Sequence, residues 1–143
     1  EPTASLDVII QAEILARLRR LRNDNEVSIL LITHDKGVVA QMADRVSVMY
    51  AGVIVETADT STIFNHPTHP YTSALLKAVP RLDNERSALR PIPGVLPNVI
   101  ELPEQCPFLP RCSKATNICK MSPKPILKEL KKGHYIACYN ATS

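Results

Sequence analysis

The clearest hydrophobic signal is a short run near the start of the chain. Residues 27–32, with the sequence VSILLI, are apolar or small, rich in β-branched types and free of polar alternation. Such a run predicts a strand buried on both faces, as in a parallel sheet covered by helices. Thr33, His34 and Asp35 follow at its carboxyl end, where ligands bind in open α/β sheets. His34 is therefore a candidate functional residue, although an ordinary loop residue would also stand there.

The segment before this run has the pattern of an amphipathic helix. Apolar residues recur every three or four positions in residues 10–21, which predicts a helix with one buried stripe. Ser5 or Asp7 can cap its start. If a strand precedes Glu1, a right-handed crossover brings the carboxyl ends of two parallel strands to one edge of a sheet. Glu1 and His34 would then share that edge, and a carboxylate beside an imidazole favours a hydrolytic site.

Shorter patterns predict the elements that follow. Residues 45–50 alternate between apolar and polar types, and a turn at residues 51–52 leads into a second short strand. This segment predicts a β-hairpin that closes the edge of the sheet. The remaining predicted elements are short helices at residues 36–43, 60–65 and 71–79.

Composition divides the chain near residue 65. Eleven of the 12 Pro residues lie after residue 66, and all 4 Cys lie after residue 105. We therefore expect an α/β part at residues 1–64, a helix with a Pro-rich connection at residues 65–103, and a Cys-rich lobe at residues 104–143. The chain begins without Met and without a lead-in element, which favours a fragment of a longer protein.

Charge and hydropathy narrow the class of protein. A net charge of +3 is too small to argue for nucleic acid as a partner. No apolar run has the length of a membrane span, and the first residues lack a signal-peptide pattern, so we expect a soluble, cytosolic chain. The late Lys residues could favour an anionic membrane surface, but a solvated face accounts for them better.

Aromatic residues are only 4% of the chain, so we expect an aliphatic core.

The four cysteines predict a metal site. Four thiols in a small lobe of a cytosolic protein favour metal over disulfides, and a tetrathiolate set suits Zn²⁺ or an iron–sulfur cluster. The C-x-x-C pairs of zinc ribbons are absent from this sequence. The uneven spacing therefore favours a [4Fe–4S] cluster over Zn²⁺, with disulfides or free thiols as a further alternative. The predicted ligands are Cys106, Cys112, Cys119 and Cys138.

The other three histidines are interpreted as structural residues and not as ligands. His66 and His69 stand three residues apart, but Pro67 and Pro70 force a turned or extended backbone there, so a linker is favoured over a metal pair. His134 is expected on the surface, because four Cys already fill a tetrahedral site.

Several motifs together resemble the ATP-hydrolysing subunits of ABC transporters. Residues 1–7 (EPTASLD) resemble the end of the Walker B motif and the D-loop, and residues 31–35 (LITHD) resemble the switch-histidine loop. Residues 44–52 (DRVSVMYAG) are similar to the family's terminal strands. Residues 65–72 (NHPTHPYT) and 106–112 (CPFLPRC) resemble the oligopeptide/dipeptide importer branch.

The resemblance implies a fold and a location. The fold is α/β: the C-terminal portion of an ABC-type P-loop NTPase domain, with parallel strands, helices and a terminal β-hairpin, plus a small Pro/Cys-rich accessory lobe. The implied location is the cytoplasmic face of the cell membrane, as a peripheral subunit. The implied partners are permease subunits, a second ATPase subunit and, indirectly, an extracytoplasmic peptide-binding protein.

The resemblance also implies residue roles. Glu1 would be the general base that orients the water attacking the γ-phosphate, and His34 would contact that phosphate. Ser5 and Asp7, in the D-loop, would serve nucleotide binding and communication across an ATPase dimer. The implied cofactors are ATP and Mg²⁺, and some importer subunits carry a [4Fe–4S] cluster on a similar Cys pattern.

The 143 residues depart from the family pattern in what they lack. They contain no G-x-x-x-x-G-K-[ST] phosphate loop, no ABC signature and no Asp before Glu1. We therefore predict that this polypeptide alone does not hydrolyse ATP. The rival hypothesis is a non-catalytic module that binds metal or a partner, and the sequence upstream of the chain would discriminate between the two.

Overall fold

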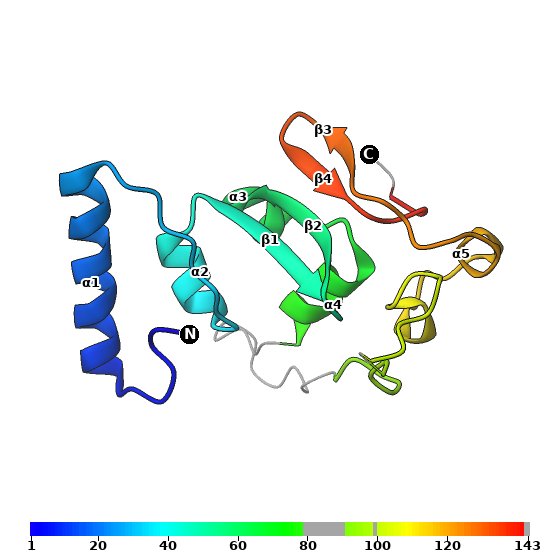
Figure 1. Cartoon of the computed structure of the whole chain (residues 1–143), viewed down its shortest axis with the longest axis horizontal. Coiled ribbons are helices and arrows are strands. Elements are labelled where there is room, and N and C mark those ends of the chain that lie inside the picture. Colours follow the sequence, from blue (N-terminus) through cyan, green and yellow to red (C-terminus); the bar gives the residue numbers. More distant parts are fainter. Residues whose placement is uncertain (79–90, 99, 142–143) are drawn as a thin grey trace. The chain divides into compact units, whose positions relative to one another are not determined.

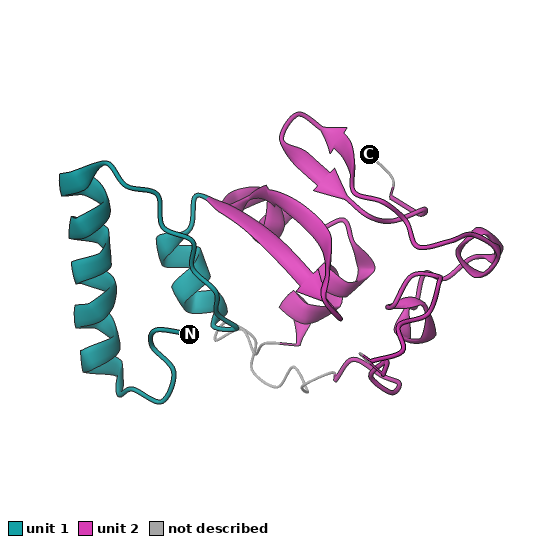
Figure 2. Cartoon of the chain, in the orientation of Figure 1, with its two compact units in different colours: residues 1–44 teal, residues 45–143 magenta. Residues whose placement is uncertain are grey.

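The computed structural model describes residues 1–78, 91–98 and 100–141 of the chain. It contains two compact units, Glu1–Asp44 and Arg45–Ser143 (Figure 2). The described part combines helices with an antiparallel sheet (Figure 1), which confirms a mixed helix and sheet architecture. The predicted domain limits near residues 64 and 103 stay predictions. Among the described residues, no helix has the length and hydropathy needed to cross a membrane.

The first unit consists of two helices and the segments around them. The helix α1 spans Val8–Asn25, and α2 spans Lys36–Met42, close to the predicted positions. Asp35 caps α2, because its Oδ1 accepts hydrogen bonds from Gly37 N at 2.8 Å and Val38 N at 3.1 Å. Its other oxygen accepts from the Gln11 side chain at 3.2 Å. One carboxylate therefore starts α2 and ties it to α1.

The predicted buried strand at residues 27–32 is not formed. This segment has no strand assignment, and several of its apolar side chains are exposed, Leu30 at 89% and Ile32 at 71%. An extended segment needs neighbours to satisfy its backbone donors and acceptors, and no described strand of the chain pairs with this one. The sheet pairings in the described residues are all antiparallel, so the parallel strands expected from this run are absent from them.

The second unit is built around a four-stranded sheet. The strands β1 (Arg45–Tyr50) and β2 (Val53–Asp59) form the predicted hairpin. Its turn places Ala51 and Gly52 at φ angles of 47° and 75°, a region that suits Gly. The strands β3 (Lys128–Lys131) and β4 (His134–Ile136) complete the order β1-β2-β4-β3. The hairpin therefore lies on one side of an antiparallel sheet and not at the edge of the predicted parallel sheet, and its neighbour β4 comes from the end of the chain.

Short helices connect the strands. α3 spans Thr60–Asn65 and begins at Asp59, whose Oδ1 accepts from Thr62 N at 2.8 Å. α4 spans Pro70–Lys77; it confirms the predicted helix, except that Val79 lies outside the described residues. The later elements are a 3-10 helix, η1 (Leu109–Arg111), and α5 (Asn117–Met121). The predicted Pro-rich connection is described only at residues 91–98 and 100–103.

Aromatic rings occupy the centre of this unit. Phe108 is 2% exposed, and its ring centroid lies 5.2 Å from that of Tyr50 and 5.3 Å from that of Tyr71. Val48, Val55 and several other apolar residues surround them. The expectation of a purely aliphatic core is therefore wrong: although aromatic residues are few, three of them pack together. Aromatic side chains bury a large area each, so three suffice to centre a small core.

A buried carboxylate joins three parts of the second unit. Glu56, on β2, is fully buried. Its side chain accepts hydrogen bonds from Thr68 N at 2.8 Å and His69 N at 3.1 Å, just before α4, and from His134 Nε2 at 2.9 Å, on β4. His134 is only 6% exposed, so its prediction as a surface residue is wrong. The imidazole is buried because it meets a carboxylate 78 positions away in the sequence.

Removing this carboxylate should destabilise the second unit strongly. Glu56→Ala leaves the buried N–H of His69, the partly buried N–H of Thr68 and one buried imidazole without their acceptor, and the loss of a buried acceptor costs about 1–3 kcal/mol per group. We expect the free energy of unfolding, measured by urea titration, to fall by about 3 kcal/mol or more. Glu101→Ala is the matched control, because Glu101 is exposed. A loss below about 1 kcal/mol for Glu56→Ala would show that the network is not required.

Candidate functional site

Glu1 and His34 are in direct contact within the first unit. His34 Nδ1 lies 2.6 Å from Glu1 Oε1, and since a carboxylate only accepts, the imidazole is the donor. This hydrogen bond, together with the interaction with the His34 charge, lowers the pKa of the Glu1 carboxyl. Both side chains are accessible, at 47% for Glu1 and 81% for His34. The structure therefore brings together the two predicted catalytic residues, without the sheet edge that was expected to do so.

The two predicted D-loop residues lie on the chain between Glu1 and α1. Asp7 Oδ1 accepts hydrogen bonds from Ile9 N and Ile10 N, both at 3.0 Å, so Asp7 is the cap of α1. Ser5 has a φ of 62°, which is uncommon for a residue with a side chain. Two successive turns, Ala4 N to Glu1 O and Leu6 N to Thr3 O, give the segment its curvature. A role of Ser5 and Asp7 across a dimer stays a prediction.

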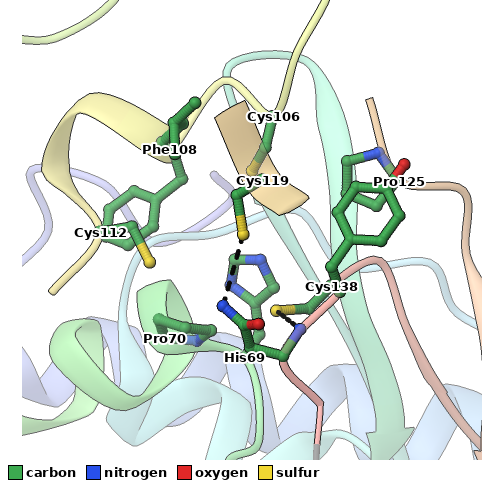
Figure 3. Close-up of a pocket in the computed structure, with 11 residues that line it drawn as sticks. His69, Pro70, Cys106, Phe108, Cys112, Cys119, Pro125 and Cys138 are labelled. Atoms are coloured by element: carbon green, nitrogen blue, oxygen red, sulfur yellow. Dashed lines mark hydrogen bonds between the residues drawn. The ribbon is translucent and has the colours of Figure 1, made fainter. Parts of the chain in front are cut away.

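All four cysteines of the second unit line a common cavity (Figure 3). They come from separate elements. Cys106 precedes η1 and Cys112 directly follows it, Cys119 lies on α5, and Cys138 follows β4. All four are free thiols, so the disulfide alternative is not the state found here. The folding of the lobe therefore gathers the predicted ligand set from 33 residues of chain.

Burial controls the protonation of these thiols. It is the main cause that raises the pKa of Cys106, Cys112 and Cys138, and repulsion between neighbouring thiolates adds to it. Burial also acts on Cys119, but hydrogen bonds from Thr116 and Asn140 outweigh it and lower the pKa of that thiol. Four sulfurs that repel one another as thiolates favour a cation or a cationic cluster among them.

The chemistry of the donor set fits a tetrathiolate site. The positions of the side chains fit a single metal ion less well. No described His, Cys, Asp or Glu residues form a group of three or more placed to hold such an ion. Tetrahedral Zn²⁺ at about 2.3 Å from each sulfur requires the sulfurs to lie roughly 3.8 Å apart. A cluster holds each Cys on a different iron atom and so suits a wider set of sulfurs. The arrangement is therefore that of four separate thiols around one cavity.

His69 lines the same cavity. It is 1% exposed, and its Nδ1 accepts a hydrogen bond from Tyr71 N at 3.1 Å, which caps α4. Burial lowers the pKa of this imidazole to about 4, against a smaller opposing effect of Glu56. Its backbone is extended, one of the two conformations predicted for this Pro-rich segment, but the side chain is more than a linker residue. A sequence signal for this cap exists. Pro is common at the first position of a helix, so Pro70 indicates a helix start, and the polar residue before it, His69, is then a candidate cap.

Comparison with known proteins finds a family model that matches part of the second unit. A family model described as "Oligopeptide/dipeptide transporter, C-terminal region" matches residues 55–119. The chain is also 49% identical over 124 residues to the oligopeptide transport ATP-binding protein OppD of Haemophilus influenzae. This alignment covers 87% of the chain and 38% of the relative. The chain is thus similar to the C-terminal region of oligopeptide/dipeptide transporters over residues 55–119, and to an oligopeptide transport ATP-binding protein over most of its length.

Two further relatives match in the same way. OppD of Escherichia coli is 45% identical over 139 residues, which are 97% of the chain and 41% of the relative. The dipeptide transport ATP-binding protein DppD of Bacillus subtilis is 50% identical over 119 residues, which are 83% of the chain and 36% of the relative. The chain spans about two fifths of the length of these relatives.

The contact between Glu1 and His34 can be tested by titration. His34→Ala removes the hydrogen bond and the charge that lower the pKa of the Glu1 carboxyl, so this pKa should rise towards its ordinary value. The measurement is the chemical shift of the Glu1 carboxyl carbon, followed by NMR between pH 2 and pH 7. His66→Ala should leave it unchanged. An unchanged Glu1 pKa in His34→Ala would show that the two side chains do not interact in solution.

The buried His69 should make stability depend on pH. Its pKa is lowered to about 4 when folded and is about 6.5 when unfolded. The unfolded chain thus binds the extra proton, and the stabilisation present above pH 6.5 is lost as the pH falls towards 4. Between pH 7 and pH 5 we expect His69 to account for a loss of about 2 kcal/mol in the free energy of unfolding.

The measurement compares the wild type with His69→Asn by urea unfolding at both pH values. Asn keeps a side-chain acceptor for the cap of α4 but has no proton to gain, so its loss of stability should be smaller by that amount. His66→Gln should behave as the wild type, since His66 is exposed. Equal losses in the wild type and His69→Asn would contradict the buried, neutral state of His69.

Proposed function

We propose that this chain carries part of the ATP-hydrolysing apparatus of a peptide importer, within its ATP-binding subunit. The observation that carries the proposal is the 2.6 Å contact between Glu1 and His34. It joins the two residues that the Walker B and switch-loop motifs single out, in a chain related to oligopeptide and dipeptide transport ATP-binding proteins. The proposed substrates are ATP, with Mg²⁺, and a peptide that the complete importer moves.

The proposed chemistry is phosphoryl transfer to water. Glu1, kept ionised by the His34 hydrogen bond, orients the attacking water at the γ-phosphate and accepts its proton. His34 uses Nδ1 for Glu1, which leaves Nε2 for an oxygen of that phosphate. Asp7 and Ser5, on the segment between Glu1 and α1, are the proposed contacts to a second ATPase subunit.

The rest of the apparatus is proposed to come from other parts of the assembly. The 143 residues lack a phosphate loop and a signature motif, which hold the phosphates and Mg²⁺ in P-loop enzymes. We propose permease subunits and a second ATPase subunit as direct partners, with an extracytoplasmic peptide-binding protein acting through the permease. The proposed location is the cytoplasmic face of the membrane.

The Cys lobe is proposed to hold a metal group in the intact subunit. Cys106, Cys112, Cys119 and Cys138 would be its ligands, with a [4Fe–4S] cluster favoured over Zn²⁺. Free thiols around one cavity support this proposal. When bound, a cluster would supply one-electron redox chemistry and would fasten η1, α5 and the segment after β4 to one another.

A chimera tests the ATPase proposal. The segment of Escherichia coli OppD that aligns with this chain, 139 residues at 45% identity, is replaced by the present sequence and assembled with its own partners in membranes. We expect the chimera to hydrolyse ATP and to import peptide. Glu1→Gln and His34→Ala should each lower the hydrolysis rate by about 10²–10⁴-fold, the usual contribution of a general base and its partner.

The control variant is Asp24→Asn, an exposed carboxylate in the same unit, which should keep full activity. If Glu1→Gln and His34→Ala also kept full activity, the catalytic roles would be wrong. If a folded chimera bound its partners but hydrolysed no ATP, the non-catalytic metal-binding module would become the better function.

A further inference from the structure

Positive charge collects in the last part of the chain. Residues 105–143 contain 7 of the 17 basic residues but only one of the 14 acidic residues, Glu129. Its carboxylate is held at the β3–β4 turn, where Oε1 accepts a hydrogen bond from Gly133 N at 2.8 Å. The excess of basic residues in this part is larger than the net charge of the whole chain, +3, so the rest of the chain is net acidic. The C-terminal part is therefore the one that attracts an anionic partner.

Large apolar side chains are exposed among these basic residues. They lie in residues 118–128, which run from α5 to the start of β3 (Figure 1) and contain no acidic residue. Met121 is 87% and Ile126 is 71% exposed. Four apolar residues and three Lys interleave along the segment, and all seven are exposed: Ile118, Lys120, Met121, Lys124, Ile126, Leu127 and Lys128. A single exposed apolar residue is ordinary, but such a concentration indicates an interaction surface.

The backbone of residues 118–128 is fixed to the rest of the second unit. Lys124 N donates a hydrogen bond to Glu104 O at 2.7 Å, and the Tyr139 hydroxyl donates to Pro123 O at 2.8 Å. Pro125, between the exposed residues, is buried. The apolar and basic side chains are therefore presented to solvent by a backbone that the fold holds in place.

A groove brings the two kinds of side chain together. It has a volume of about 470 Å³, and Lys124, Ile126 and Lys128 all line it. Most of its other lining residues are apolar or Pro. Met121 stands two residues before Pro123, which also lines the groove, so its exposed side chain extends the apolar surface beyond the groove. One surface thus offers the positive charge and the apolar area that an amphipathic anion requires.

We propose that residues 118–128 bind an anionic lipid surface. The Lys ammonium groups contact the phosphates, and the apolar side chains enter the layer between the headgroups and the acyl chains. The long Lys side chains allow both contacts at once, because the charge reaches the headgroups while its neighbours insert. Each basic residue near an anionic bilayer strengthens binding by about fivefold.

The extent of the surface favours lipid over an acidic protein segment. A protein segment in the groove would meet Lys124 and Lys128, but it would not need the exposed apolar residues on α5. A lipid surface covers α5 and the groove together. The inference goes beyond the proposed ATPase function and does not depend on it, because lipid binding requires neither ATP nor another subunit.

Two paired substitutions test the two kinds of contact. Lys124→Gln with Lys128→Gln removes two charges from the groove and keeps the length of most of each side chain. Met121→Ser with Ile126→Ser removes the two most exposed apolar side chains of the segment. All four side chains are exposed, so both variants should fold, and far-UV circular dichroism verifies this.

The controls remove the same kinds of group from the first unit. Arg17→Gln with Arg20→Gln changes the net charge by the same amount at two exposed positions of α1. Ile9→Ser with Leu30→Ser removes two exposed apolar side chains. These pairs separate a surface at residues 118–128 from an effect of overall charge or of exposed apolar residues in general.

The measurement is co-sedimentation of the full chain with vesicles of phosphatidylcholine, with and without phosphatidylglycerol. We expect much tighter binding to the anionic vesicles, weakened by salt because the Debye length falls from about 10 Å at 0.1 M to about 3 Å at 1 M. The Lys pair should weaken this binding at least about tenfold, and the apolar pair at least about fivefold. Both control pairs should bind as the wild type does.

Three results would overturn the proposal. The first is a wild type that binds anionic vesicles no better than phosphatidylcholine alone, and the second is an equal loss in the control pairs and the segment pairs. The third is full binding by Met121→Ser with Ile126→Ser, which would exclude insertion. Polyglutamate is the probe for an acidic protein segment: a wild type that binds it but not the vesicles would assign the groove to a protein partner. An inactive ATPase chimera would leave each of these results unchanged.

Discussion

The Glu56 carboxylate is fully buried, so the protein must supply every donor that water would have provided. It does so from two places far apart in the sequence, the backbone before α4 and the His134 side chain on β4. The β3–β4 hairpin is short and rich in Lys, and it adds little apolar surface to the core. Its attachment to β2 depends on this carboxylate and on a few sheet hydrogen bonds. The same contact orients the backbone of His69, so the cavity of the cysteines depends on it as well.

Elements with a strong local sequence pattern could be predicted from that pattern alone. The β1 strand has a mainly alternating pattern, its hairpin has a Gly in the turn, and α2 and α3 each follow an Asp that caps them, so the sequence predicts these elements almost to the residue. The strand predicted at residues 27–32 fails for the opposite reason, because a buried strand is defined by its neighbours and not by its own composition. The strands β3 and β4 were missed because four and three residues are too few to show a period.

The residues of the candidate sites also divide into those that the local sequence identifies and those that depend on the folded structure. Glu1, His34 and the four cysteines could be singled out from residue type and motif, and the structure brings each set together. His69 and His134 could not, because their roles follow from a tautomer and from a carboxylate that only the folded chain brings near. A histidine beside Pro was correctly expected in a turn. What its ring does there depends on the tertiary structure.

The two sites also differ in how much of them this chain contains. The pair Glu1 and His34 is solvent-exposed and needs a phosphate cradle that the 143 residues do not encode, so its chemistry requires additional protein. The cysteine cavity is lined entirely by residues of Arg45–Ser143, and the aromatic core and the Glu56 network that support it lie in the same unit. The proposed metal binding can therefore be measured on the chain as it is, whereas the proposed hydrolysis has to be tested in a complete importer. A lobe that bound metal in a chain that hydrolysed no ATP would therefore agree with both proposals and would not set one against the other.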